Sequence, residues 1–401
     1  MDYPAWIYSV RHVPAPDVDG CARLIVRTNE FLKDAYLTVN GIRREPFTNQ
    51  EEPFAPYTHG FLLTRKELSE HPTLCFYATA LLTEGEADKD DSSADALRVS
   101  PIEYIAEDEE TLEGLLHATD SGYRLLSKEQ SQITNGLEYT HLHLQTKENA
   151  PVEAFLLRAD PTHIGFEMGV TGDGAPTSVQ TNEQDQPSLR YPISTVESMA
   201  TSAINEGLDI CAAVNADYFD MFGNNHPAGL CVKGGKIIAN ADSTRAFFAV
   251  TNDGLPVIAD FFSHPEYRNK LRFAVGGLHV LLRDGLPYDL AFCEPFGERA
   301  HPRTAVGVCA DGTVLLLVVD GRIPDYSNGA TLADLALLLR AFGAVNALNL
   351  DGGGSSICLI RPDGEEYFKR TNRPADLMRP NECLIREGYN AILLYRKRNS
   401  D

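Results

Sequence analysis

The sequence predicts a protein of the α+β (mixed α/β) class, in which a small β-sandwich-like domain precedes a larger domain with a central mixed sheet and packed helices. Two observations support this prediction. The first 117 residues contain short β-rich runs separated by turns, whereas residues 301–357 read as strand, helix, strand, glycine loop and strand. The 401 residues, 43% of them hydrophobic, are enough for two cores. We therefore expect one domain over 1–117 and a second over 118–401.

The N-terminal region is expected to form a sandwich because its apolar runs are short and regularly interrupted. The pair Asn40-Gly41 is typical of a tight turn, and the acidic run 84–95 predicts a loop. The predicted strands cover residues 22–28, 35–39, 60–64, 73–82 and 96–105, with a helical connector over 111–117. Nothing in this region has the pattern of a catalytic site.

Residues 118–300 are expected to continue with strands and one helix. Alternation over Leu137–Gln145 predicts a strand, and the polar composition of 172–186 predicts a loop. The run from Ser194 to Glu197 is typical of a capping box that opens a helix, and Gly207 is placed to end it. An apolar strand over 210–214 then leads into Asn215-Ala216-Asp217-Tyr218-Phe219.

The densest group of candidate residues lies in 301–357. An apolar strand over 314–319 ends at Asp320-Gly321-Arg322, and a second over 345–350 ends at Asp351 and a glycine loop. Between them, Thr331 and Asp334 are expected to cap a helix. Since this order is typical of an α/β unit around one sheet, Asp320 and Asp351 would be held rigidly at strand ends.

Charge and cysteine usage limit the partners and the compartment. The chain has 35 Lys and Arg against 57 Asp and Glu, and its net charge of −22 repels nucleic acid, so no nucleic-acid partner is expected. The sequence shows neither a membrane span nor a signal peptide. Its eight scattered cysteines are expected to be reduced, which favours a cytoplasmic protein, while a removed leader and the oligomeric state stay open.

Several motifs are suited to binding an anion. A guanidinium offers phosphate a planar pair of donors, which makes Arg303 and Arg322 candidates. The loop Gly352-Gly353-Gly354 can turn backbone N–H groups toward an anion, and Ser355 adds a hydroxyl. Each motif alone equally fits an ordinary turn or a salt bridge, and His301 alone fits a structural histidine.

The carboxylates Asp217, Asp320 and Asp351 are candidates for activating water or holding a ligand. The sequence has no Walker loop, no Gly-x-Ser-x-Gly elbow and no His- or Cys-rich zinc spacing. Clustered carboxylates leave a Ca²⁺ or Mg²⁺ ion open, because both prefer oxygen ligands. We therefore expect no required cofactor, with a divalent Ca or Mg ion as the alternative and its ligands unassigned.

Taken in order, the motifs resemble the phosphodiester glycosidase family, which includes the lysosomal uncovering enzyme and bacterial exopolysaccharide-associated relatives. The resemblance extends over about residues 120–401, with Gly276-Gly277-Leu278 where the family has Gly-Gly-Pro and an altered stretch over 375–378. The matching segments are 215–219, Gly276-Gly277 with Gly285, His301 to Gly307, Asp320-Gly321-Arg322, Gly329 to Leu332, Asn349 to Ser356, and Asn372-Arg373-Pro374 with Arg379-Pro380.

The resemblance implies a hydrolase that cleaves a sugar-1-phosphodiester, such as one linked through N-acetylglucosamine-1-phosphate, to free sugar and a phosphomonoester. A sugar phosphate or phosphoglycan is the implied partner. Arg303 and Arg322 would stabilise the phosphate charge, and Asp351, ahead of Asp320 and Asp217, would activate water or stabilise the oxocarbenium ion. The implied substrate-binding residues are Asn215, His301, Gly352, Gly353, Gly354, Ser355, Asn372 and Arg373.

Two other functions remain open at this point. The same fold could serve a non-catalytic carbohydrate- or phosphoglycan-binding protein, with the N-terminal domain as a binding module. A phosphoesterase that attacks at phosphorus is the other alternative. Intact Asp217, Asp320 and Asp351 favour an enzyme over a binding protein.

Overall fold

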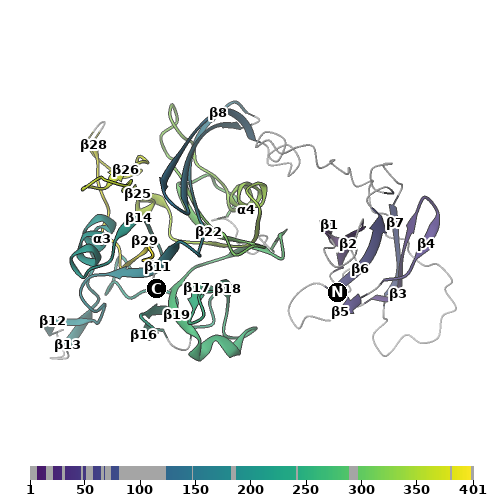
Figure 1. Ribbon diagram of the computed structural model, residues 1–401, viewed down its shortest axis with the longest axis horizontal. Helices are drawn as coiled ribbons and strands as arrows, with labels where there is room; N and C mark the ends of the chain where they lie inside the picture. Colours follow the sequence, from purple (N-terminus) through teal and green to yellow (C-terminus); the bar gives the residue numbers. More distant parts are fainter. Residues whose placement is uncertain are drawn as a thin grey trace. The chain divides into compact units, whose positions relative to one another are not determined.

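The computed structural model divides into two compact units, residues 1–109 and 110–401 (Figure 1). The boundary expected near residue 117 lies outside the described residues, as do the strand expected over 96–105, the loop over 84–95 and the connector over 111–117. The structure describes residues 7–14, 21–28, 32–46, 48–50, 57–64, 67, 74–80, 123–146, 148–181, 187–240, 243–288, 297–379 and 382–398.

The N-terminal unit consists of two antiparallel sheets. One has the order β1-β2-β6-β5 and the other β4-β3-β7. Phe61 and Phe76, one from each sheet, meet edge to face with ring centroids 6.1 Å apart, which is consistent with the predicted sandwich. The strands are β1 (Ile7–Pro14), β2 (Cys21–Thr28), β3 (Leu32–Val39), β4 (Ile42–Arg44), β5 (Thr48–Gln50), β6 (Tyr57–Thr64) and β7 (Leu74–Ala80).

The largest sheet of the second unit has eight strands, in the order β21-β20-β24-β22-β23-β10-β9-β8. Its strands are β8 (Tyr123–Thr134), β9 (Leu137–Thr146), β10 (Pro151–Ala159), β20 (Val280–Arg283), β21 (Leu286–Pro287), β22 (Arg303–Cys309), β23 (Val314–Val319) and β24 (Ala344–Asn349). Every pairing between neighbours in it is antiparallel.

Two five-stranded antiparallel sheets complete the larger unit. The second sheet has the order β11-β29-β14-β25-β26 and the third β16-β15-β19-β17-β18. The second sheet contains β11 (Ile164–Val170), β14 (Ile210–Asn215), β25 (Cys358–Ile360), β26 (Lys369–Arg370) and β29 (Asn390–Arg396), and the third contains β15 (Cys231–Lys233), β16 (Lys236–Ala239), β17 (Phe247–Thr251), β18 (Pro256–Ala259) and β19 (Leu271–Gly276). Two hairpins lie outside them: β12 (Thr177–Thr181) with β13 (Pro187–Arg190), and β27 (Leu377–Arg379) with β28 (Glu382–Cys383).

One hydrophobic core joins the three sheets. Leu316 of β23, Val214 of β14 and Phe248 of β17 belong to the same buried cluster. Helix α4 (Leu332–Ala341) covers the other face of the eight-stranded sheet, where it packs with Leu315 and Leu317. Helix α3 (Val196–Asn205) covers the second sheet in the same way, beside β14 (Figure 1). Because both faces of β23 are buried, its sequence is a continuous apolar run.

The predicted fold class is wrong: the larger unit is built from antiparallel sheets, not from a mixed sheet with packed helices. The described residues contain two α-helices, α3 and α4, with two short 3₁₀ turns, and none of these helices is long and apolar enough to cross a membrane. The strands over 314–319 and 345–350 do share a sheet, but β22 runs antiparallel between them and β25 belongs to another sheet. Strands buried on both faces have the same composition in either architecture, which explains the error.

The local predictions are confirmed in part. Thr331 and Asp334 form the predicted capping box at the start of α4. The capping box predicted from Ser194 to Glu197 is wrong, because the N-cap of α3 is Thr195, whose hydroxyl accepts from the Ser198 N–H. The loop expected over 172–186 is interrupted by β12. The thiols of Cys211, Cys231, Cys309 and Cys358 are buried and free, as expected for reduced cysteines.

The capping box gives a direct stability test. Asp334 N donates to Thr331 Oγ1 at 3.1 Å, and Thr331 N and Oγ1 both donate to Asp334 Oδ2, at 2.8 and 2.7 Å. Thr331→Ala removes the hydroxyl, and we expect urea denaturation to show a loss of about 1 kcal/mol in the free energy of unfolding. Thr201→Ala on the exposed face of α3 is the control and should not destabilise. Equal effects in both variants would contradict a capping role.

Candidate active site

The candidate site lies where β23 and β24 end and β22 begins, at one end of the strands of the eight-stranded sheet. We call this end of the strands the edge of the sheet. Because β22 runs antiparallel between β23 and β24, its first residue lies where the other two strands end. Arg303 is opposite Val319 and Ala305 is opposite Asn349 in the strand register. Asp320 is the first residue after β23 and Asp351 the second after β24. Both are therefore brought to the same edge as Arg303, two strand spacings or about 10 Å apart.

The second sheet is tied to this edge through Asn215, at the end of β14. Its Nδ2 donates to the Asp351 carbonyl at 2.6 Å, and its Oδ1 accepts from Thr304 Oγ1 at 2.8 Å and from Ile357 N at 3.2 Å. The Asp351 N–H also donates to the Ala216 carbonyl at 2.8 Å. Asn215 is buried, and its side chain joins β14 to the ends of both β24 and β25.

Asp217 follows Asn215 and is only 3% exposed. Its Oδ2 accepts from the Gly229 N–H at 2.7 Å, while Oδ1 is buried with no hydrogen-bond partner. Burial raises the pKa of this carboxyl to about 7, against the opposing effects of the Gly229 N–H and Arg245. A Cβ at Gly276 would lie 2.7 Å from Asp217 Oδ2 and 2.5 Å from Gly229 Cα, so the close approach requires glycine.

Asp320 is 1% exposed and fully hydrogen-bonded. Oδ1 accepts from Asn372 Nδ2 at 2.8 Å, and Oδ2 accepts from the Arg373 N–H at 2.6 Å and the Tyr326 hydroxyl at 3.1 Å. Burial raises the pKa of Asp320 to about 6 despite these donors. Asn372 also donates to the Ser356 carbonyl at 3.0 Å and accepts from the Cys358 N–H at 2.8 Å. Asn372 and Asp320 therefore hold the segments after β23 and β24 together.

Asp351 is the aspartate of this group that solvent reaches, since it is only partly buried. Its Oδ1 accepts from the Gly352 N–H at 2.9 Å. Partial burial raises the pKa of Asp351 to about 6, opposed chiefly by the Ser355 hydroxyl and the Gly352 N–H. It therefore combines partial exposure, a defined orientation and a carboxylate that is ionised at neutral pH.

The backbone of the glycine loop lies against the Arg322 side chain, and the N–H groups of Gly352 and Gly353 are already hydrogen-bonded within the protein. Gly352 N–H bonds Asp351, and Gly353 N–H donates to the Pro302 carbonyl at 2.8 Å. A Cβ at Gly353, whose φ is +63°, would come within 3.3 Å of both terminal nitrogens of Arg322. Arg322 is exposed and has a φ of +61°, which is rare for a residue other than glycine. An exposed guanidinium therefore lies over Gly353, two residues from Asp351.

Arg303 has a different environment, being 1% exposed. Its Nε donates to the Ala330 carbonyl at 3.1 Å and its Nη2 to the Arg299 carbonyl at 3.0 Å. His301 lies between the two predicted arginines: burial lowers the pKa of its imidazole, and Arg303 and Arg322 lower it further. The imidazole is therefore neutral at pH 7. Of the two predicted arginines, Arg322 is exposed to solvent. Arg303 is buried and is hydrogen-bonded to backbone carbonyls of neighbouring segments.

Sequence reasoning missed an open pocket beside Asp217. It has a volume of about 460 Å³, and Arg245, which is exposed, lies in its wall. The lining residues are Tyr218, Phe219, Asp220, His226, Pro227, Ala228, Arg245 and Leu278. The Tyr218 hydroxyl accepts from Asn349 Nδ2 at 2.7 Å, which connects the pocket to the end of β24. Arg245 is an isolated arginine in the sequence, and no motif identifies it.

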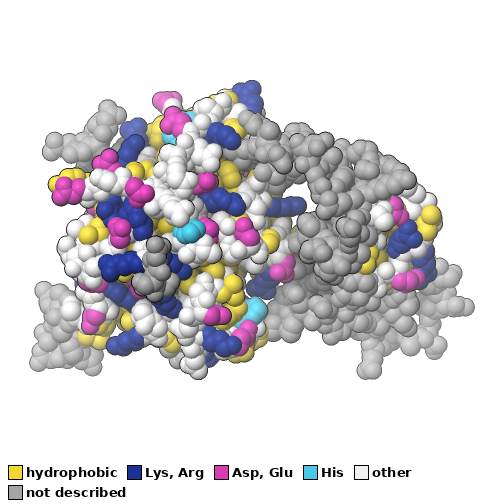
Figure 2. Space-filling model, in the orientation of Figure 1, with side chains coloured by type: hydrophobic (Ala, Val, Ile, Leu, Met, Phe, Trp, Pro, Cys, Tyr) yellow, Lys and Arg dark blue, Asp and Glu magenta, His cyan; other side chains and the backbone are white. Residues whose placement is uncertain are grey.

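The net charge of −22 is not spread as a uniform acidic surface. Figure 2 shows Lys and Arg side chains interspersed with Asp and Glu across the visible face of the larger unit. The screening length of about 8 Å at physiological salt makes the local arginines more important than the total charge for an anion at the site. The acidic composition is therefore compatible with an anionic ligand.

The fold and these groups define a β-rich domain with a guanidinium and carboxylates at one sheet edge, an arrangement suited to hydrolysis of a phosphate-bearing substrate. The phosphodiester glycosidase family is matched over residues 209–385, which include β14, the pocket and the edge. The match lies within the region in which the motifs were found, and the resemblance predicted from them is confirmed.

Two relatives illustrate the match. The N-acetylglucosamine-1-phosphodiester alpha-N-acetylglucosaminidase of Bos taurus is 31% identical over 149 residues, 33% of this chain and 28% of that protein. The SPbeta prophage-derived uncharacterized protein YomE of Bacillus subtilis is 48% identical over 56 residues, 14% of this chain and 8% of that protein. The chain thus spans less than a third of the length of either.

A solved structure shares the fold. The catalytic domain of the zebrafish N-acetylglucosamine-1-phosphodiester alpha-N-acetylglucosaminidase, auto-inhibited by its pro-peptide, aligns with a TM-score of 0.52 at 19% identity. The alignment covers 68% of this chain and 89% of that one.

The hydrogen bonds of Asn215 predict a structural role that a variant can test. Asn215→Ala would leave the Thr304 hydroxyl, the Ile357 N–H and the Asp351 carbonyl without their partner in a buried site. We expect a loss of about 3 kcal/mol in the free energy of unfolding, measured by urea denaturation. Asn269→Ala, at an exposed position, is the control and should change it little. Unchanged stability in Asn215→Ala would favour a role in binding substrate alone.

Proposed function

We propose that this protein hydrolyses a sugar-1-phosphodiester to free sugar and a phosphomonoester. The observation that carries the proposal is the position of exposed Arg322 over Gly353, two residues from Asp351, which is the least buried of the three aspartates. A phosphate held by Arg322 would place the attached sugar within reach of the carboxylate. N-acetylglucosamine is the proposed sugar, because the Bos taurus relative, 31% identical, is by name an N-acetylglucosamine-1-phosphodiester alpha-N-acetylglucosaminidase.

We assign the chemical roles to the less buried residues of the site. Arg322 binds the phosphate and stabilises the charge that develops on it as the glycosidic bond breaks. Asp351 orients and deprotonates water at the anomeric carbon, or stabilises the oxocarbenium-like transition state. The phosphate monoester leaves readily, so a strong general acid is less necessary. The pocket beside Asp217, with Tyr218 and Arg245 in its wall, receives the remainder of the substrate.

Buried members of the site act as positioning residues in this proposal. Arg303 donates to the carbonyls of Arg299 and Ala330, and it adds to the effect of burial in lowering the pKa of His301. Asn215, Asn372 and Asp320 fix the segments that carry Arg322 and Asp351. We therefore no longer assign Asn215 to sugar hydroxyls or Arg303 to direct contact with phosphate.

Isotope labelling tests the reaction. The pure full chain is incubated with UDP-N-acetylglucosamine and related sugar-1-phosphodiesters in H₂¹⁸O, and the products are analysed by mass spectrometry. The proposal predicts label in the sugar, because water attacks carbon. Label in the phosphate would identify a phosphoesterase, and binding without turnover across the panel would identify a binding protein; either result contradicts the proposal.

The exposed arginine should be essential for turnover. Arg322→Ala removes the guanidinium over Gly353, and we expect kcat/KM to fall about 100-fold or more, as for other removed groups that stabilise transition-state charge. Arg398→Ala, an exposed arginine beyond the far end of β29, is the matched control and should retain activity. Retained activity in Arg322→Ala would remove this residue from the site.

The pKa of Asp351 predicts the pH dependence. A base must be deprotonated to act, so kcat/KM should rise as the pH increases through about 6 and level off above pH 7. Asp351→Asn should abolish the activity, whereas Asp311→Asn, at the turn between β22 and β23, should keep the wild-type profile. A rate that is flat or falls between pH 5 and pH 7 would contradict the assignment.

A further inference from the structure

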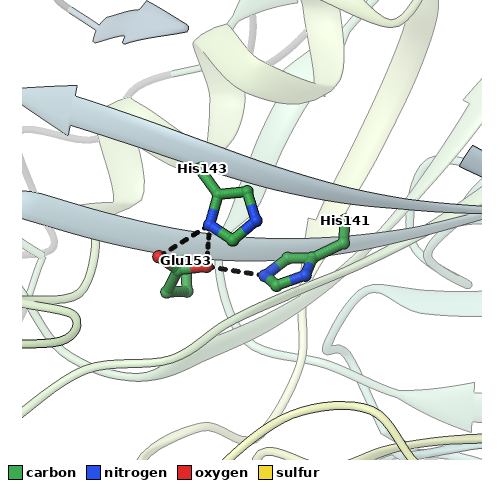
Figure 3. A group of neighbouring side chains, drawn as sticks. All are labelled: His141, His143 and Glu153. Carbon is green, nitrogen blue, oxygen red and sulfur yellow. Dashed lines mark hydrogen bonds and ion pairs between the residues drawn. The ribbon is translucent and has the colours of Figure 1, made fainter. Parts of the chain in front are cut away.

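Three donor side chains gather on one face of the β9–β10 hairpin, outside the residues assigned above (Figure 3). His141 and His143 are two apart on β9 and therefore share a face, and Glu153 of β10 lies directly opposite His143. His141 is further oriented by stacking on Phe155, with ring centroids 4.4 Å apart. The strand register thus fixes the relative positions of two imidazoles and a carboxylate.

The three donor groups point at one another. His141 Nε2 lies 2.6 Å from Glu153 Oε2, and His143 Nδ1 lies 2.9 Å from the same oxygen and 3.1 Å from Oε1. One ligand atom from each residue fits within a common span of 4.8 Å. Ligands about 2.0–2.2 Å from a central ion lie within that span of each other, so small side-chain rotations would turn the hydrogen-bonded group into a coordination shell.

We propose that His141, His143 and Glu153 bind a divalent transition-metal ion, with Zn²⁺ as the first candidate. Two imidazoles and one carboxylate form a donor set that suits zinc better than Ca²⁺ or Mg²⁺, which prefer oxygen ligands. The side chains are 18%, 31% and 12% exposed, so an ion could enter and keep water as a further ligand. On binding, the ion takes the place of the hydrogen bonds between the imidazoles and the carboxylate, and each neutral imidazole carries its proton on the ring nitrogen that does not bind the ion.

The backbone of Glu153 connects this group to the segment that carries Arg322. The Glu153 carbonyl accepts from the Asp320 N–H at 3.0 Å, and its N–H donates to Ser327 Oγ at 3.0 Å. Ser327 Oγ in turn donates to the Asp320 carbonyl at 2.6 Å. Metal binding that immobilises Glu153 would therefore stiffen residues 320–327, and the ion acts as a positioning element for the site without touching the reaction.

Direct titration tests the proposal independently of activity. The full chain is stripped with a chelator, exchanged into buffer and titrated with ZnCl₂ by isothermal calorimetry, with the melting temperature measured in parallel. We expect one ion per chain, a rise in melting temperature on saturation, and little response to Ca²⁺ or Mg²⁺. Two single variants, Glu153→Gln and His143→Ala, should each weaken zinc binding at least about 10-fold. Glu153→Gln retains the capacity to form hydrogen bonds, so its effect reports on the loss of the carboxylate ligand. Circular dichroism confirms that each variant is folded.

A second histidine–glutamate pair supplies the matched control. His264 Nδ1 lies 3.2 Å from Glu266 Oε1 in an exposed turn that lacks a second histidine. His264→Ala should leave zinc binding unchanged. The proposal is overturned if the pure wild-type chain binds no zinc at micromolar concentration, or if folded Glu153→Gln and His143→Ala variants bind zinc as wild type does.

Discussion

The antiparallel placement of β22 between β23 and β24 determines where the chemistry of this domain can occur. Two strands that run the same way deliver Asp320 and Asp351 at one edge, and the strand between them begins there with Arg303. The hydrogen bonds of Asn215 then attach the second sheet to the same edge. Residues from distant parts of the sequence are thereby held on a rigid framework.

Burial explains how the edge can combine several carboxylates. It raises the pKa of Asp217 to about 7 and those of Asp320 and Asp351 to about 6, so near neutral pH their ionisation responds to small changes in environment. Donors around Asp320 compensate for removing its charge from water. Exposure distinguishes the proposed roles: Arg322 is exposed and Asp351 is partly buried, whereas Arg303, Asn215 and Asp320 are buried and hold them in place.

Much of the site could be predicted from sequence because it depends on short segments. Strand-end aspartates and the capping box of α4 are local signals, and the ordered motifs identified the family. The direction of strand pairing is not local: the apolar run 314–319 fits a parallel or an antiparallel sheet, which is why the fold class was mispredicted. Nor does a sequence show that Arg303 is buried or that the Asn215 amide is hydrogen-bonded to Asp351, Thr304 and Ile357. It also does not show that His141 and His143 lie beside Glu153.

A crystal structure of Asp351→Asn with an intact sugar-1-phosphodiester tests the central claim most directly, because the substitution should slow turnover while preserving the binding site. The account predicts a phosphate oxygen within hydrogen-bond distance of the Arg322 guanidinium and an anomeric carbon facing residue 351. A substrate bound with its phosphate away from Arg322, or with its anomeric carbon turned from the end of β24, would contradict it.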